Sequence, residues 1–127
     1  MEKILTLIIK QEYFDAIKAG EKKTETREIR PNTAHKYIEY FNPTTGETYP
    51  STAQIPEDAE LDARPLKYDA IRFCVGHDKA SETMLVKVEG SEIFILQDEA
   101  GEDIVYDYKG AKYVAAQIDY TLGDIIE

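Results

Sequence analysis

The apolar and polar positions in the first third of the chain predict a strand, a helix and a second strand. Lys3–Ile9 is rich in isoleucine and leucine, which indicates a buried strand. In Gln11–Ala19 the apolar residues repeat at helical spacing, and Gly20 follows where a helix commonly ends. Lys22–Arg30 is polar, has threonines two residues apart and lacks an apolar helical face, so we expect a strand there.

The next segment is harder to assign from its pattern. Apolar residues within 31–41 repeat at spacings of three and four after Pro31, which favours a short second helix. Residues 42–67 contain four of the five prolines and show no periodicity. We expect a long loop there, or a loop that holds a short hairpin.

The second half has the pattern of a β structure. Gly90 indicates a bulge or bend within one strand, and turns are expected at 99–102 and at Lys109-Gly110. The expected strands are Tyr68–Val75, Thr83–Gln97, Asp103–Tyr108 and Tyr113–Tyr120. Two helices near the start and five or six mostly antiparallel strands predict an α+β domain with a closed or nearly closed small barrel.

Composition narrows the class of protein. The 127 residues, 43% of them hydrophobic, suit one domain with one core rather than a disordered tail. No apolar run approaches the ~18 residues of a membrane helix, and no signal-peptide cleavage site follows the first residues, so a cytoplasmic protein without membrane contact is expected. The single cysteine, Cys74, is expected to be buried and inert, while His35 and His77 are isolated. We therefore expect no metal and no cofactor.

Charge is unevenly distributed along the chain. The formal net charge is −10, which argues against a general polyanion binder. Residues 1–40 hold eight bases and seven acids, whereas residues 41–127 hold seven bases and eighteen acids. An anion-binding surface is therefore expected in the first third, and the acidic remainder could dock a protein partner.

The residues most able to carry chemistry lie between the first helix and the following strand. Strand spacing puts Lys23, Glu25 and Arg27 on one side, with Lys22 just before them. Lysine supplies a mobile cation and arginine a rigid fork for carboxylate or phosphate, so the cluster could hold an anionic ligand. The alternative is a solvated face whose ion pairs contribute little.

The segment YFDAIKAGEKKTETR resembles the start of the ASCH domain, a branch of the PUA-like superfamily. The family pattern is matched by Ile17, Gly20, Lys22, Glu25 and Arg27. The last strand and its late glycine, YVAAQIDYTLGDIIE, are similar as well. The resemblance covers residues 4–30 and about 68–126, and makes 1–127 a single ASCH/PUA-like domain with a Pro-rich insertion at about 42–66.

The resemblance implies a small PUA-like mixed β-barrel with two short N-terminal helices. It implies a cleft beside the first helix that binds RNA or a nucleotide-like ligand through Lys22, Lys23, Glu25 and Arg27. Tyrosines could stack on bases, and Tyr37, Tyr40 and Tyr68 flank the segments of this cleft.

Two other functions stay open. A related branch contains small amidohydrolases that act on acylated nucleosides. Lys22 matches their lysine, but Glu25 stands where they have threonine and Lys87 where they have glutamate, with Glu89 two residues further on. A hydrolase would therefore use Lys22, Glu25 and Glu89. The third possibility is a protein-interaction module with an acidic docking surface.

Overall fold

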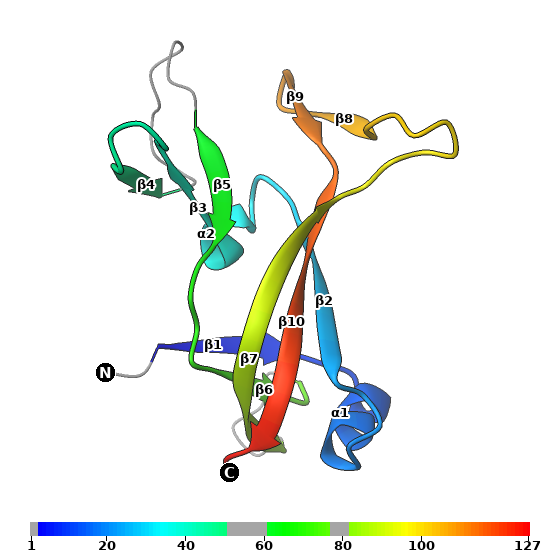
Figure 1. Ribbon diagram of the computed structural model, residues 1–127. Coiled ribbons are helices and arrows are strands. Elements are labelled where there is room, and N and C mark those ends of the chain that lie inside the picture. Colours follow the sequence, from blue (N-terminus) through cyan, green and yellow to red (C-terminus); the bar gives the residue numbers. More distant parts are fainter. Residues whose placement is uncertain (1–2, 51–60, 77–81) are drawn as a thin grey trace. The chain divides into compact units, whose positions relative to one another are not determined.

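The computed structural model describes residues 3–50, 61–76 and 82–127, and Figure 1 shows their ribbon. The described residues contain two helices and ten strands. The helices are α1 (Gln11–Lys18) and α2 (Ala34–Tyr37). The strands are β1 (Ile4–Ile8), β2 (Thr24–Ile29), β3 (Ile38–Phe41), β4 (Thr48–Pro50), β5 (Asp62–Pro65), β6 (Ala70–Cys74), β7 (Thr83–Ile95), β8 (Val105–Tyr108), β9 (Ala111–Val114) and β10 (Ala116–Ile125).

The strands form three sheets. The largest has the order β1-β6-β7-β10-β2, and it is mixed, because β1 pairs with β6 in parallel while β6 and β7 are antiparallel. The second has the order β4-β3-β5, and the third is the β8–β9 hairpin. The chain divides into two compact units: unit 1 is 1–26, 67–91 and 119–127, and unit 2 is 27–66 and 92–118.

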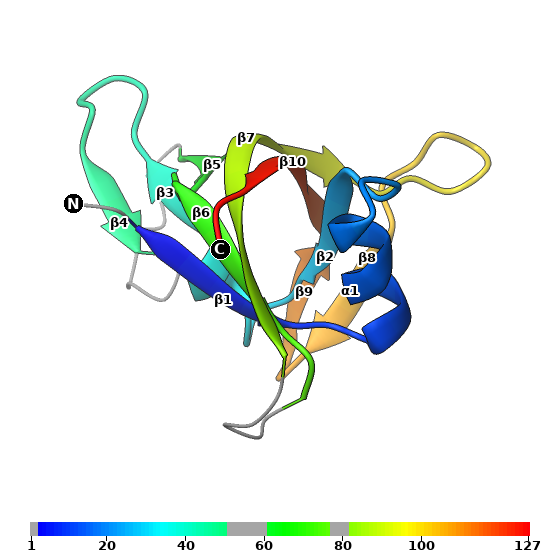
Figure 2. The same ribbon diagram turned by 90° about the horizontal axis from the view of Figure 1, so that it is seen from below.

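Unit 1 is a curled sheet with α1 packed against it (Figure 2). Helix α1 buries Phe14 and Ile17, β1 buries alternate residues, and β6 and β7 bury consecutive ones. The buried sheet residues include Leu5, Leu7, Ile71, Phe73, Val86, Tyr120 and Leu122. Because β6 is buried along most of its length, it forms the centre of this core.

Unit 2 combines the β4-β3-β5 sheet, α2 and the β8–β9 hairpin. The hairpin turns at Lys109 and Gly110, whose φ angles of 49° and 81° suit the two-residue turn that matches strand twist. A second turn precedes β8: the Asp98 carboxylate accepts hydrogen bonds from the backbone N–H groups of Ala100 and Glu102, and Gly101 has φ 82°. Both turns were predicted from the sequence.

The α+β class, the first strand, the first helix and the second strand are confirmed. Two expectations in unit 2 are wrong in part. The helix expected within 31–41 is limited to α2, and Ile38–Phe41 forms β3 instead. The loop expected over 42–67 contains β4 and β5, which both pair with β3. Residues 51–60 lie outside the described residues. The alternative of a hairpin within 42–67 is not what the described residues show, because β4 and β5 lie on either side of β3.

Strand β7 continues through Gly90 as one strand, and the bulge or bend expected there stays a prediction. Two further expectations differ in detail. The last expected strand is divided into β9 and β10, and β10 extends to Ile125. Cys74 is half-buried rather than buried. His77 lies outside the described residues. No helix among the described residues is long and apolar enough to cross a membrane.

Candidate ligand site at the turn between α1 and β2

The turn that follows α1 is fixed by its own backbone. Gly20 directly follows Ala19, the C-cap residue of α1. Its φ angle is 79°, a conformation that glycine adopts without steric cost. The N–H groups of Glu21 and Lys22 both donate to the carbonyl of Ala16, at 2.9 and 3.1 Å. The chain therefore leaves the helix along one defined path, which sets the position of Lys22.

Lys22 and Glu25 form the polar centre of the site. Lys22 Nζ lies 3.2 Å from Glu25 Oε1 and donates to the carbonyl oxygen of Thr24 at 2.6 Å. The same ammonium lies 5.6 Å from the ring centroid of Tyr13, within cation–π range. Glu25 is only 6% exposed and is the one buried charged residue among those described. The burial of Glu25 therefore excludes one of the two interpretations of the sequence, in which this carboxylate lies on a fully solvated face.

Strand β2 presents its side chains to two faces, as predicted. Thr26 Oγ1 donates to Asp119 Oδ1 of the neighbouring strand β10 at 2.7 Å, so these two residues share one face. Alternation places Glu25 on the opposite face, together with the buried Tyr120 of β10. The carboxylate of Glu25 is thus directed into unit 1 rather than toward solvent.

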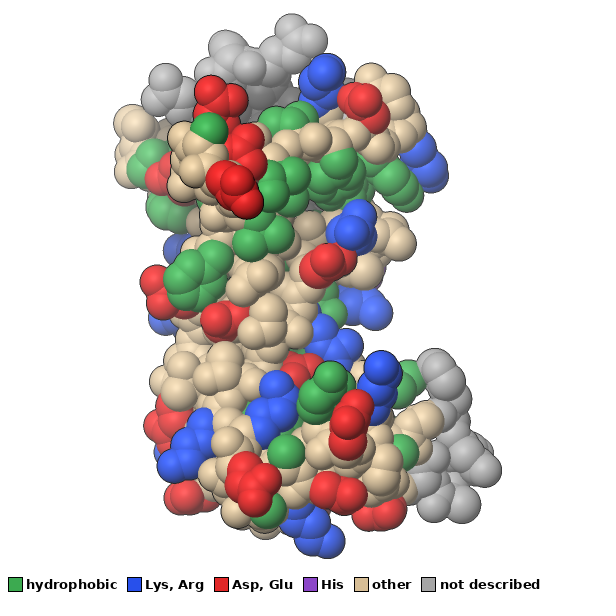
Figure 3. All heavy atoms as spheres, turned by 90° about the vertical axis from the view of Figure 1, so that its right-hand side faces the viewer, with side chains coloured by type: hydrophobic (Ala, Val, Ile, Leu, Met, Phe, Trp, Pro, Cys, Tyr) green, Lys and Arg blue, Asp and Glu red, His purple; other side chains and the backbone are tan. Residues whose placement is uncertain are grey.

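A hollow of about 320 Å³ lies beside this turn. It is lined by Ile17, Lys18, Gly20, Lys22, Lys23, Leu122, Gly123, Asp124 and Ile125. We call it the lysine hollow. Its charged lining consists of three lysines and one aspartate, so it is locally cationic in an acidic protein. Figure 3 shows basic side chains beside acidic ones in the α1 region of unit 1.

Lys18 and Lys23 differ from Lys22 in exposure and in their side-chain contacts. Both are exposed. Neither makes an ion pair or a side-chain hydrogen bond within the described part of the chain, whereas Lys22 is held by Thr24 and Glu25. An ammonium group has three N–H donors, so Lys22 has at most one left for a ligand. Lys18 and Lys23 are therefore the cations most available to an anion.

The remaining candidates, Arg27 and Glu89, do not line the hollow. Arg27 is half-buried, belongs to unit 2 and has interactions of its own. The Glu89 side chain lies against Gly123: a Cβ added to Gly123 would come within 2.9 Å of the Glu89 carboxyl carbon. Successive residues of β10 face opposite sides of the sheet. Leu122 is buried on the same side as Glu25, so Gly123 and the Glu89 side chain beside it lie on the opposite side.

The structure thus brings together Lys22, Lys23 and Glu25 of the predicted set. It adds Lys18 and Asp124, which the motif does not contain. Lys18 is the last residue of α1 and lies only four positions before Lys22, a closeness that was visible in the sequence. Asp124 comes from the far end of the chain through β10, and no local pattern could assign it.

No group of three or more histidine, cysteine or acidic side chains that could hold a metal ion occurs in residues 3–50, 61–76 and 82–127. Comparisons with protein-family models, with curated proteins and with solved structures gave no match for this chain.

Proposed function

We propose that this protein is an ASCH domain with a PUA-like barrel that binds a nucleotide-like ligand or a short single-stranded RNA, and that the lysine hollow is its ligand site. The observation that carries the proposal is the convergence of Lys18, Lys22 and Lys23 on one hollow in a protein of net charge −10. Binding is local, because these three lysines are the basic residues that line the hollow.

The hollow suits a ligand with an anionic part and an apolar part. The exposed ammonium groups of Lys18 and Lys23 would contact phosphate oxygens. Ile17, Leu122 and Ile125 supply an aliphatic wall for a sugar or base. A volume of about 320 Å³ is at the low end of the ~300–1,000 Å³ range of ligand sites, which favours one nucleotide over a long polymer.

The geometry favours binding over hydrolysis. A general acid or base must lie within hydrogen-bond reach of the group on which it acts. The ammonium of Lys22 already contacts Glu25 and Thr24, and Glu25 is buried. Glu89 lies on the other face of the sheet. The three groups that the hydrolase alternative requires do not converge on one point.

The test is a titration with a nucleoside 5′-monophosphate, a short single-stranded RNA and an RNA duplex across a salt series. Three lysine contacts predict a log–log salt slope of about −2 for single strands, at about 0.7 per phosphate. We expect Lys18→Glu with Lys23→Glu to weaken binding by at least about tenfold and to flatten the slope. Lys22 is kept, because it also stabilises the turn.

Lys67→Glu is the matched control. Lys67 is exposed and belongs to unit 1, but it does not line the hollow. Combined with Lys87→Glu, at a second exposed lysine of unit 1 that does not line the hollow, it makes the same change of charge and should leave affinity within about twofold. Equal losses in both variants would show that only net charge matters. Absence of binding by every nucleic acid and nucleotide would refute the proposal and favour a protein-interaction module.

A further inference from the structure

Unit 2 carries a pocket of about 280 Å³ that the lysine hollow does not include. Its walls come from β2, α2, β3, β5, β7, β8, β9 and β10. Most of the lining is aliphatic, and its main polar groups are Arg30, Tyr40, Tyr106 and Tyr113. We call it the tyrosine pocket. An apolar lining with a few polar groups is typical of small-molecule sites, and the small volume suits one ring system.

Two tyrosines form an aromatic wall. Tyr106 of β8 and Tyr113 of β9 are directly opposite in the hairpin register. Their ring centroids are 6.1 Å apart with an interplanar angle of 30°, and Tyr108 meets the Tyr113 ring edge-on at 6.3 Å. Tyr113 is still 40% exposed. A flat ring can therefore add to an existing aromatic stack without displacing a buried side chain.

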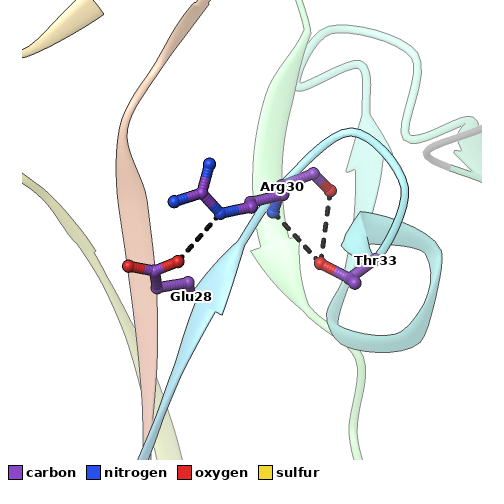
Figure 4. Close-up of polar contacts among 3 residues, drawn as sticks. All are labelled: Glu28, Arg30 and Thr33. Carbon is purple, nitrogen blue, oxygen red and sulfur yellow. Dashed lines mark hydrogen bonds and ion pairs between the residues drawn. The ribbon is translucent and has the colours of Figure 1, made fainter. Parts of the chain in front are cut away.

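The cation at this wall is Arg30. Its Cζ lies 5.6 Å from the Tyr106 ring centroid, and its Nε donates to Glu28 Oε2 at 2.8 Å. In Figure 4 the line from Arg30 to Glu28 starts at Nε, and neither terminal nitrogen of Arg30 has a line to the residues drawn. The Thr33 hydroxyl accepts from the backbone N–H of Arg30 at 3.1 Å, which fixes the start of this side chain. Arg30 thus keeps a two-donor edge for an anion.

Three residues that line the pocket, Ile95, Tyr113 and Val114, are exposed large hydrophobic residues. Phe94, Ile104 and Val105, which are within two positions of lining residues in the sequence, are exposed as well. Figure 3 shows such side chains gathered in the region of β8 and β9 in unit 2. Singly exposed apolar residues are ordinary, but a group of them around an aromatic pocket is typical of a binding surface.

We propose that the tyrosine pocket binds a small planar aromatic ligand that carries one anionic group. The ring stacks on Tyr113 and Tyr106 between aliphatic walls, and the anion accepts hydrogen bonds from the terminal nitrogens of Arg30. Tyr40 also lines the pocket and adds a donor, because a tyrosine hydroxyl is protonated at neutral pH. The anion can be a carboxylate or a phosphate, since both accept two parallel hydrogen bonds from arginine.

The experiment measures dissociation constants by ligand-observed NMR titration with three probes: 2-naphthoate, the uncharged 2-naphthalenemethanol and adenosine 5′-monophosphate. We expect naphthoate to bind at least about tenfold more tightly than the alcohol, because a charge-assisted pair is added. Arg30→Gln should reduce this ratio below about threefold while the alcohol binds as before. Tyr113→Ala should weaken both naphthalene probes.

Arg64→Gln is the control for the arginine. Arg64 belongs to the same unit and repeats the arrangement of Arg30, with Nε donating to Glu39 at 2.8 Å and Cζ 4.9 Å from the Phe41 ring, but it does not line the pocket. Its loss should leave all affinities unchanged. Tyr113→Phe keeps the ring if Tyr113→Ala disturbs the hairpin, and should retain most of the naphthoate binding.

The adenosine probe separates the two sources of the ligand and the two proposed sites. Loss of its binding in Arg30→Gln supports a phosphate ligand in the tyrosine pocket. Binding that survives Arg30→Gln but is lost with Lys18→Glu and Lys23→Glu assigns the nucleotide to the lysine hollow and favours an aromatic carboxylate for unit 2. Absence of naphthoate binding, or naphthoate binding that neither Arg30→Gln nor Tyr113→Ala alters, would overturn the inference.

Discussion

Breaking the ion pair between Lys22 and Glu25 tests most directly what stabilises the turn after α1. At 3.2 Å, two unit charges attract by about 5 kcal/mol in a medium of effective dielectric constant 20. Burial of Glu25 costs desolvation energy, and the Lys22 side chain is 26% exposed, so water screens the pair. The net coupling that remains is about 1–3 kcal/mol, well above that of a surface pair.

The assay is a double-mutant cycle of Lys22→Met, Glu25→Gln and the double variant, measured by urea unfolding. We expect Lys22→Met alone to destabilise the protein by about 2–3 kcal/mol, because the buried carboxylate loses this partner. At a slope of ~1–3 kcal/mol/M, that lowers the urea midpoint by about 0.7–3 M. Lys18→Met should change stability by less than about 0.5 kcal/mol, since Lys18 is exposed.

A coupling energy below about 0.5 kcal/mol would refute this reasoning, because that value belongs to a solvated pair. It would mean that the other interactions of Glu25 satisfy its charge and that Lys22 is available to a ligand. The ligand titrations would then have to include Lys22→Met beside the Lys18 and Lys23 variants. A change in the slope of the urea transition would instead indicate an altered unfolded state.

Three other substitutions test the fold. Gly20→Ala should cost about 1–2 kcal/mol in urea unfolding, because φ 79° is strained for alanine, although nothing lies within 4 Å of its added Cβ. Phe73→Ala should cost about 3–5 kcal/mol by the same assay, because the side chain is completely buried. The third concerns pH. Burial, and then the nearby Tyr113, raise the pKa of Tyr40, so the stability that this phenol contributes is present below about pH 10 and is lost as pH rises through the raised value. Tyr40→Phe should therefore flatten the decline in thermal midpoint between about pH 9 and 12, and an unchanged decline would contradict this.

Local sequence signals predicted unit 1 better than unit 2. Helix α1 and its end at Gly20 depend on neighbours within a few residues, so periodicity and one glycine were sufficient. The helix predicted over residues 38–41 was wrong for the opposite reason. Its apolar residues fit a helical spacing, but Ile38, Tyr40 and Phe41 are also strand formers, and pairing with β4 and β5 decides the outcome. The partner β5 begins at Asp62, too far along the chain for a pattern to show.

For the candidate site, too, the sequence predicted the features that depend on neighbouring residues and missed those that depend on distant ones. Lys22, Lys23 and Glu25 lie close together in the sequence and in the structure. The burial of Glu25 depends on the packing of β2 beside β10, whose residues are almost a hundred positions away. The tyrosine pocket could not be found in the sequence at all, because Arg30, Tyr40 and Tyr113 come from three separate segments.

The acidic residues of the chain limit how strongly the ligand affinity of the lysine hollow can depend on salt concentration. At physiological ionic strength the Debye length is about 8 Å, so acidic groups farther away than this repel a phosphate only weakly, while Lys18 and Lys23 attract it at contact. Lowering the salt strengthens the attraction, but it also extends the repulsion from the eighteen acids of residues 41–127. The two effects oppose each other. The salt slope should therefore be shallower at low than at moderate salt, a curvature that a uniformly basic nucleic-acid-binding protein would not show.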